Sequence, residues 1–393
     1  MFKHLFKMIW NKKKQNSLLI VEILLSFMVI FAVFSFALNS YSNYAKPMGF
    51  NYDKVWAISY NHTLETTNPD SVTLVYQTLL RNIKSMPLVV DASYHSGNVP
   101  FSNNHSTTGL TQKGVQVTGI NDFFTDENYV STTGTKMLSG RWYNKTDAIT
   151  KSTVIVINNT LKEKLFGKAD AVGKMLGDNP KTRQKIIGVI ADIKNDGDYQ
   201  VAAPALYNRH DTSAYKWMGK ILVKVSPEAD AAFEGKLYKL MAGSLKKSNI
   251  EIEHLDNKLT AYNKFTLVPL IILSIVAAFL IINVALGIFG VLWYNINKRR
   301  GEIGLRRAVG APGAAVSAQL VYEALILATL SIIIGAFFAV QFPLLNVFDL
   351  PASVYLFAML FAMIFIYLLV LVCSLYQGKQ AAAIYPAVAL HEE

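Results

Sequence analysis

Four long apolar segments divide the chain, and together they predict four membrane-spanning helices. They lie at residues 17–38, 265–294, 314–345 and 352–376. A helix needs about 20 apolar residues to cross the hydrocarbon core of a bilayer, and each segment reaches that length. The first segment is too long for the apolar part of a secretory signal peptide, and no small-x-small cleavage pattern follows it. We therefore interpret it as a retained helix.

Residues 39–264, between the first two apolar segments, show the mixed patterns of an α+β domain. The order strand–helix–strand is predicted near both ends of this region, with the first helix starting at Asn68-Pro69-Asp70 and the second at Pro227. The predicted elements are strands at 55–60, 88–94, 221–225 and 250–255, and helices at 71–84 and 227–247. Two such units predict one subdomain assembled from both ends of the region.

The middle of this region, about residues 95–210, is then an insertion that forms a second subdomain. It begins with a loop rich in Ser, Asn, His and Thr at 95–109. A turn is predicted at Asn195-Asp196-Gly197-Asp198. Further strands are predicted near 115–117, 154–157 and 185–190.

The distribution of Lys and Arg predicts the orientation of the four helices, because short loops rich in these residues stay in the cytoplasm. Basic residues cluster before the first span, between spans two and three, and after span four. The turn at residues 346–351 has none. Residues 39–264 are therefore expected outside, and both termini inside. The basic residues in question are Lys3, Lys7, Lys12, Lys13, Lys14, Lys298, Arg299, Arg300, Arg306, Arg307 and Lys379.

Composition fits a membrane protein, since 52% of the 393 residues are hydrophobic. The net charge of +11 would suit nucleic-acid binding, but much of it lies in the segments that set orientation. This placement argues against a nucleic-acid partner. Cys373 is the one cysteine of the sequence, so the external domain must fold without a disulfide within the chain.

The second apolar segment is longer than a bilayer requires. Its 30 uncharged residues would make a helix of roughly 45 Å, against a hydrocarbon core of roughly 30 Å. Asp256 or Asn257 can cap a helix that starts still further out. We expect a helix that continues outside the bilayer as a stalk, and the first span to do the same before Pro47. A tilted helix of ordinary length is the alternative.

The sequence carries no enzyme signature of its own. Residues 167–175, GKADAVGKM, resemble a phosphate-binding loop, but the spacing of the glycines is wrong and Met175 replaces the Ser or Thr of that motif. Residues 192–203 vaguely resemble a calcium loop, but Lys194 and Ala203 occupy ligand positions. The histidines are scattered, without a metal-binding spacing. We therefore expect no catalytic residue, cofactor or metal site on this chain.

The N-terminus has the pattern of an amphipathic helix that lies on the cytoplasmic leaflet. Apolar residues recur at helical spacing on one face, and Lys3, His4 and Lys7 lie opposite them. A basic tail that only sets orientation is the alternative interpretation. The predicted lipid-facing residues are Phe2, Leu5, Phe6, Ile9 and Trp10.

The loop between spans two and three, NKRRGEIGLRRAVGAPG, predicts a short cytoplasmic helix over residues 300–309 that ends at Gly310 and Pro312. Glu302 and Arg306 form an i,i+4 pair in the favourable order. A loop that only oriented the chain would not need apolar residues among its arginines. The pattern therefore predicts docking to a partner or to lipid. The candidate residues are Arg300, Glu302, Ile303, Leu305, Arg306, Arg307 and Val309.

Two acidic residues, Glu22 and Glu323, lie inside apolar segments near their cytoplasmic ends. An acid within a membrane span is a candidate functional residue, because its burial is costly. The alternative is that each carboxylate reaches the interface or pairs with a nearby Lys or Arg.

These residues resemble a known family. The segment RRGEIGLRRAVGAPGAAVSAQLVYEALIL is similar to the signature of the FtsX-like permeases, and the tail at 384–390 is similar to their terminal P-x-x-A-L pattern. In the external region, GINDFFTDE, SGRWY, VIVINNTLKEKLFGKADAVGKML and IIGVIADI are similar to the periplasmic core domain of MacB-type permeases. MacB itself carries an ATPase on the same chain, and this sequence shows none.

The resemblance implies the permease subunit of an ABC transporter in the bacterial inner membrane. It implies a separate ATPase that binds ATP and Mg, a second identical or different permease, and force transmitted to the external domain for export or extraction of a substrate. A periplasmic adaptor is a further partner to expect. The alternatives are activation of an external cell-wall hydrolase, as in FtsX, and an ATPase-independent sensor or scaffold.

The expected division of the chain follows from these interpretations. Its parts are an N-terminal helix (1–16), span 1 (17–38), the periplasmic core domain (39–264), span 2 with its stalk (265–294), the coupling helix (295–313), span 3 (314–345), span 4 (352–376) and a cytoplasmic tail (377–393).

Overall fold

The computed structural model describes residues 13–61, 64, 68–148, 153–179, 183–209 and 218–383. It divides into two compact units, which we call the helical unit and the sheet unit. The helical unit comprises Met1–Ser42 and Leu267–Glu393, and the sheet unit comprises Asn43–Thr266. The expected fold class, four membrane-type helices with an α+β domain between the first and the second, is confirmed.

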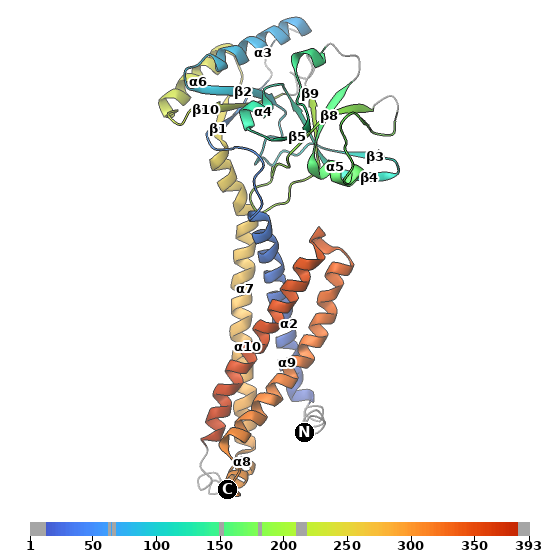
Figure 1. The fold of residues 1–393 in the computed structure, drawn as a ribbon. Coiled ribbons are helices and arrows are strands. Elements are labelled where there is room, and N and C mark those ends of the chain that lie inside the picture. The colour runs from blue at the N-terminus through green and yellow to red at the C-terminus, as the bar shows by residue number, and fades with distance from the viewer. Residues whose placement is uncertain are drawn as a thin grey trace. The chain divides into compact units, whose positions relative to one another are not determined.

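Among the described residues, four helices are long and apolar enough to span a membrane, and they match the four predicted segments. They are α2 (Lys13–Tyr44), α7 (Leu255–Lys298), α9 (Gly313–Leu344) and α10 (Ala352–Ala382). The described part of the unit also contains two short elements, α8 (Arg300–Ala308) and the 3₁₀ turn η3 (Val347–Asp349). Helices α9 and α10 form a helical hairpin joined at η3 (Figure 1).

Close contacts at small residues hold the helical unit together, as is common where lipid removes the hydrophobic driving force between helices. Phe27 of α2 is fully buried, and its ring lies against Gly335 of α9. A Cβ atom added at Gly335 would come within 2.5 Å of that ring. Gly378 of α10 meets the Ser317 side chain of α9 in the same way.

Helix α7 begins at Leu255, ahead of the apolar segment and next to the predicted capping residues Asp256 and Asn257, and it runs for 44 residues. That length corresponds to roughly 66 Å. The start ahead of the apolar segment has a simple cause. The polar residues that follow Leu255 end the apolar run without ending the helix, since Asp256 and Lys258 are compatible with helical backbone. A helix this long agrees with the stalk interpretation.

The sheet unit is built on one eleven-stranded sheet with strand order β11-β1-β10-β2-β4-β9-β6-β8-β5, in which β3 pairs with β4 and β7 with β8. The strands are β1 (Val55–Ser59), β2 (Val89–His95), β3 (Thr107–Gln112), β4 (Val115–Thr125), β5 (Met137–Gly140), β6 (Val154–Asn158), β7 (Met175–Leu176), β8 (Gln184–Ile190), β9 (Ala205–Arg209), β10 (Lys220–Val225) and β11 (Glu251–His254). The helices are α3 (Pro69–Lys84), α4 (Tyr129–Thr133), η1 (Lys145–Ala148), α5 (Asn159–Phe166) and α6 (Ala231–Ser244).

The first half of the sheet, β11-β1-β10-β2, comes from both ends of the region, as predicted, and its strands pair antiparallel. Helices α3 and α6 pack on it around the buried side chains of Tyr76 and Leu237 (Figure 1). Asn68 caps α3 as expected. The predicted start of α6 at Pro227 is wrong. The helix begins at Ala231, because the Asp230 carboxylate accepts a hydrogen bond from the Phe233 backbone N–H and caps it there.

The second half, β4-β9-β6-β8-β5, includes two parallel pairs, β4 with β9 and β6 with β8. Part of the predicted 95–109 loop is instead strand β3. It forms a hairpin with β4 through Lys113 and Gly114, which both have the positive φ that a tight two-residue turn requires. Strands β5, β7 and β9 were also not predicted. They are short, and β5 and β9 pair with strands that are remote in sequence.

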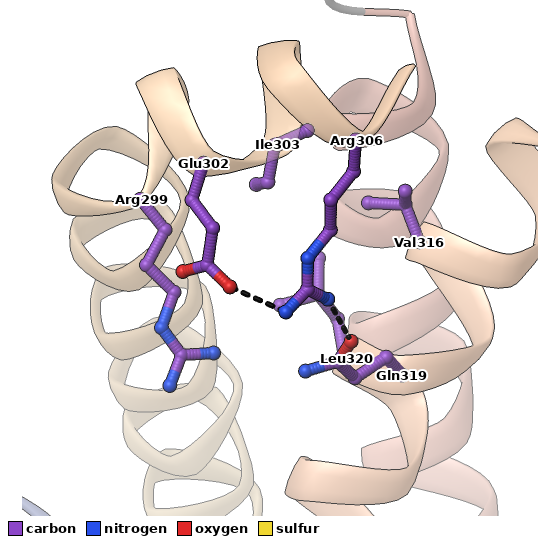
Figure 2. A pocket seen from close by; sticks show the side chains of 7 residues that line it. All are labelled: Arg299, Glu302, Ile303, Arg306, Val316, Gln319 and Leu320. Atoms are coloured by element: carbon purple, nitrogen blue, oxygen red, sulfur yellow. Dashed lines mark hydrogen bonds and ion pairs between the residues drawn. The ribbon is translucent and has the colours of Figure 1, made fainter. Parts of the chain in front are cut away.

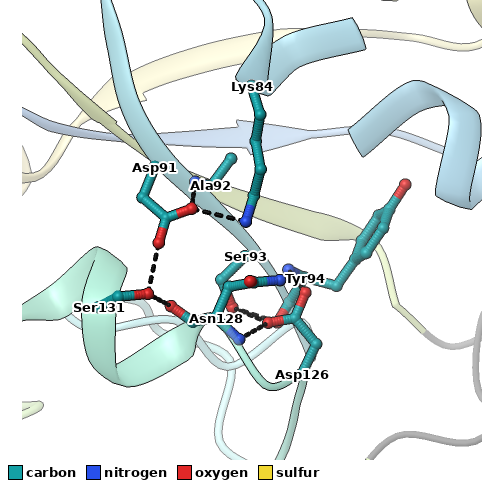
Figure 3. A network of polar contacts seen from close by, with 8 residues as sticks. All are labelled: Lys84, Asp91, Ala92, Ser93, Tyr94, Asp126, Asn128 and Ser131. Carbon is teal, nitrogen blue, oxygen red and sulfur yellow. Dashed lines mark hydrogen bonds and ion pairs between the residues drawn. The ribbon is translucent and has the colours of Figure 1, made fainter. Parts of the chain in front are cut away.

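The two halves form one continuous sheet, but they meet at a single pair of residues, His95 of β2 and Thr125 of β4. Figure 3 shows the polar side chains that cross this seam. The buried Asp126 carboxylate accepts hydrogen bonds from the Ser93 hydroxyl and the Tyr94 backbone N–H. It therefore satisfies a backbone group of β2 where β4 has turned away. Nearby, Asp91 accepts a hydrogen bond from Ser131 of α4 and pairs with Lys84 at the end of α3.

Candidate functional site

Helix α8 is the candidate coupling element, and its sequence explains both of its ends. Glu302 lies in the first turn, and Arg306 and Arg307 lie in the last, which is the favourable order for the helix dipole. Gly310 adopts a φ of +98°. Its N–H bonds to the Arg307 carbonyl, and the next N–H, from Ala311, bonds to the Arg306 carbonyl. This pair of bonds is a Schellman motif, and it ends the helix where the sequence predicts.

A small apolar cluster holds α8 against the rest of the helical unit. Ile303 is 7% exposed and packs with side chains of α7, α9 and α10. The other members of the cluster are Ile296, Val316, Leu320 and Ala381. Burying one aliphatic side chain contributes about 1.5–3 kcal/mol. Ile303 therefore fixes α8 in place.

A chain of polar contacts continues this attachment around a small pocket between α7, α8 and α9 (Figure 2). The Arg306 guanidinium donates to Glu302 Oε1 at 2.5 Å and to Gln319 Oε1 at 3.0 Å. Gln319 Nε2 in turn donates to Glu323 Oε1 at 3.2 Å. Arg299 Nη1 lies 3.0 Å from the same Glu323 oxygen. The arrangement ties the orientation of α8 to the first turns of α9.

The predicted docking residues separate into two groups. Leu305 is 56% exposed and Val309 is 81% exposed, so both are available to a partner. Ile303, in contrast, is buried against α7, α9 and α10, and its part in docking stays a prediction. Arg300 and Arg307 are half-buried, and Arg307 Nη1 lies over Gly313 at the start of α9. The exposed face is thus narrower than the sequence alone implies.

The two acids within the spans have different surroundings. Glu323 is buried and joins the α8 cluster through Arg299 and Gln319. Glu22 is half-buried and lies against α7, where a Cβ atom added at Gly287 would be 2.4 Å from the Glu22 Oε2 atom. The ion pair with Arg299 agrees with the interpretation that the Glu323 carboxylate pairs with a nearby basic residue, and a functional role for this acid stays a prediction.

Several predictions concern other parts of the chain. The interfacial helix with Phe2, Leu5, Phe6, Ile9 and Trp10, and the tail at 384–390, lie outside the described residues. The GKADAVGKM segment follows α5 and leads into β7, and Lys174 lies over the Phe166 ring at 5.0 Å. Within the described part of the chain, no group of three or more His, Cys, Asp or Glu side chains is placed to hold a metal ion.

Sequence reasoning missed Arg299 and Gln319 as parts of the cluster. Gln319 precedes Glu323 by four residues, which places both on one face of α9. That spacing was a usable signal. The role of Arg299 depends on how α7 and α9 pack, so no local pattern could reveal it.

Comparison with known families gives two matches. Residues 18–237 match the MacB-like periplasmic core domain, and residues 274–386 match the FtsX-like permease C-terminal domain. The second match contains α8 and the Arg306–Gln319–Glu323 contacts.

Several known proteins are similar to part of this chain. A probable export ATP-binding/permease protein of Pseudomonas fluorescens (strain Pf0-1) is 26% identical over 234 residues, covering 56% of this chain and 34% of that protein. The macrolide export ATP-binding/permease protein MacB 1/2 of Paracoccus denitrificans (strain Pd 1222) is 23% identical over 242 residues, covering 60% of this chain and 35% of that protein. The chain thus aligns with about a third of the length of these relatives.

Two solved domains align with part of this chain. The periplasmic region of MacB from Actinobacillus actinomycetemcomitans aligns with a TM-score of 0.39 and 17% identity, over 54% of this chain and 94% of that one. The extracellular domain of the transporter YknZ from Gram-positive bacteria aligns with a TM-score of 0.35 and 12% identity, over 50% of this chain and 99% of that one. Because the first family match alone covers more than half of the chain, this multi-pass membrane protein belongs to the family of ABC transporter permeases that combine a MacB-like periplasmic core domain with an FtsX-like permease domain.

Proposed function

We propose that this protein couples ATP hydrolysis by a cytoplasmic partner to movement of its sheet unit on the periplasmic side of a bacterial inner membrane. The partner binds ATP and Mg, and this chain hydrolyses nothing itself. A second permease copy or homologue completes the transporter, and both termini lie in the cytoplasm. The work done outside is the export or extraction of a substrate.

The observation that carries the proposal is the division of α8 into an anchored face and a free face. Ile303 and Arg306 attach the helix to α7, α9 and α10, while Leu305 and Val309 remain exposed. A helix fixed on one side and apolar on the other suits a load-transmitting contact. Force applied at Leu305 would pass directly into α9 through the contacts of Arg306 with Gln319.

The charge pattern supports a cytoplasmic position for this helix. Arg299, Arg300, Arg306 and Arg307 lie within or beside it, and the turn between α9 and α10 has no basic residue. The relatives named as export proteins carry both ATP-binding and permease functions, which supports a functional link between this fold and an ATPase.

The test is a charge placed on the free face. In Leu305→Asp every Lys and Arg is retained, so membrane insertion should be normal. Loss of one buried aliphatic contact, about 1.5–3 kcal/mol, should weaken partner binding about 10- to 150-fold. The measurement is recovery of the ATP-hydrolysing partner with tagged full-length chain from solubilised membranes, together with the ATPase rate of the complex.

Leu345→Asp is the matched control, because Leu345 is also an exposed leucine at a helix end, 72% exposed, but in the turn between α9 and α10. It should leave partner recovery unchanged. Ile303→Asp is unsuitable as a test, since it would disrupt the anchor of α8 itself. If Leu305→Asp inserts normally and still recovers the partner with wild-type ATPase activity, the coupling proposal is wrong.

A further inference from the structure

Lys194 is a buried cation in the loop that follows β8. Its side chain lies in the sheet unit, and the residue is 3% exposed. The Nζ atom donates to three backbone carbonyl oxygens, those of Asn43 at 2.5 Å, Lys46 at 2.6 Å and Asp198 at 3.1 Å. Each of the three ammonium hydrogens therefore has an acceptor.

One of these acceptors, the Asn43 carbonyl, lies in the last turn of α2, and a second, the Lys46 carbonyl, follows two residues after the helix ends. The Asn43 carbonyl is one of the last four of that helix, which have no partner within the helix. A cation at this end also interacts favourably with the helix dipole. Burial lowers the pKa of Lys194, and the nearby Asp198 opposes that shift. The helix end compensates for the cost of burying the charge.

The same loop holds the end of α2 by two further contacts. The Asn43 side-chain amide donates to the Tyr199 carbonyl at 3.1 Å. The Tyr44 and Tyr199 rings stack with centroids 5.6 Å apart. Residues 194–200, which we call the junction loop, thus make side-chain and backbone contacts with the last turn of α2.

On its other side the junction loop is bound to the first turns of α7. The Asn263 side chain forms two hydrogen bonds with Asp198, accepting from its backbone N–H at 3.0 Å and donating to its carboxylate at 2.8 Å. Gly197 has a φ of +89°, and a Cβ atom there would lie 2.7 Å from the Asn263 Oδ1 atom. Gln200 adds a hydrogen bond to Thr266. Only glycine allows this close approach of the loop to α7.

We propose that Lys194 is the positioning residue of a clamp that fixes the last residues of α2 and the part of α7 around Asn263 to one loop of the sheet unit. Asp198 is the shared member, since its carbonyl binds Lys194 and its N–H and carboxylate bind Asn263. The proposal concerns contacts within the sheet unit, and it does not depend on the proposed coupling to an ATPase.

The test is hydrogen exchange, read by mass spectrometry, on the full-length chain in lipid nanodiscs. Lys194→Met removes the charge but keeps an unbranched side chain. It should speed exchange of the amides in residues 46–48 and 194–200 about tenfold or more, since charged hydrogen bonds are lost. Lys224→Met is the control, because Lys224 also donates to a backbone carbonyl, that of Asp53, but at an exposed site. It should leave exchange at the junction loop unchanged.

A second variant keeps the proposal testable if Lys194→Met folds poorly. Asn263→Asp cannot donate to the Asp198 carboxylate, so it releases the loop from α7 while Lys194 stays. If the clamp is one unit, exchange should rise in residues 46–48 as well, on the α2 side. Wild-type exchange at 46–48 in Asn263→Asp, or in Lys194→Met an equal increase in β6 and β8, would show that the clamp does not exist as a unit.

Discussion

Asp126 joins β2 to β4 at the point where strand pairing stops. It is buried, and its carboxylate accepts hydrogen bonds from the Ser93 hydroxyl, the Tyr94 N–H and the Asn128 N–H. Lys194 has the opposite role, because it is a buried cation that donates hydrogen bonds to backbone carbonyl oxygens. In both places an ionisable side chain satisfies backbone groups that the secondary structure leaves unpaired, which is how buried charge is tolerated.

A pH-dependent stability follows from Asp126. Burial raises its pKa to about 6, although hydrogen bonds from Tyr94, Ser93 and Asn128 oppose the shift. The unfolded value is lower, so the folded state holds the proton more tightly. The contribution to stability is therefore full below about pH 4 and is lost as the pH rises through about 6. Its size is on the order of 3 kcal/mol.

Asp126→Asn should remove the pH-dependent contribution of Asp126 to the stability of the folded protein. The measurement is the thermal unfolding midpoint of the full-length chain in detergent at pH 4.5 and 7.5, followed by tryptophan fluorescence, since the Trp142 indole donates to the Asp126 carbonyl. Comparing the two proteins cancels other titrating groups. If the unfolding midpoint changed between the two pH values by the same amount in the variant and the wild type, the pH dependence would not come from Asp126.

At the scale of elements, the helical unit depends on small residues at helix crossings. Gly335 of α9 receives the Phe27 ring of α2, and Gly287 of α7 receives the Glu22 carboxylate. In contrast, a Cβ atom added at Gly290 of α7 would meet nothing within 4 Å. Glycine content alone therefore does not identify a packing position, and the neighbouring helix decides which glycine matters.

Gly335→Val should destabilise the helical unit by about 1–3 kcal/mol, because the added atoms overlap the fully buried Phe27 ring. Gly290→Val is the matched control and should cost much less, since its side chain meets open space. The measurement is the midpoint of heat-induced loss of monodisperse protein in detergent, read by fluorescence-detected size exclusion. Equal midpoints for the two variants would show that the α2–α9 contact does not limit stability.

At the scale of the whole molecule, the distribution of charge organises the chain. Residues 39–264 carry 27 basic and 21 acidic residues. This region is much longer than the short loops whose charge sets orientation, so its charge does not enter the orientation argument. The decisive basic residues flank the apolar helices. Of the net charge of +11, 27 − 21 = +6 belongs to this region, and the remaining +5 belongs to the helices and the segments that flank them.

This topology predicts a pattern of thiol accessibility. In a Cys373→Ala background, single cysteines at Asn103 and Lys239, both exposed in the sheet unit, should react with a membrane-impermeant maleimide in spheroplasts. A cysteine at the exposed Asn297, near the end of α7, should react only after permeabilisation. If only the cysteine at position 297 reacted in intact spheroplasts, the orientation of the chain would be the opposite of the one predicted.

The sequence by itself determined the features that local pattern controls. Apolar run length predicted the four spanning helices, Asn68 predicted the start of α3, and Gly310 the end of α8. The pairing of strands from both ends of the region was also predictable, because the strand–helix–strand pattern repeats there. The segment containing Glu302 and Glu323 was enough to indicate the family.

Tertiary structure alone decided which side chains of those elements are used. Ile303 and Leu305 are equally apolar in the sequence, but the packing of α7, α9 and α10 buries the first and leaves the second free. In the sequence, Lys194 is only the residue that occupies a ligand position of a calcium-loop-like segment. The three backbone carbonyl oxygens that accept hydrogen bonds from its Nζ atom are seen only in the tertiary structure. The physical reason is common to both cases. Burial and hydrogen-bond partners depend on residues remote in the chain, which no local periodicity encodes.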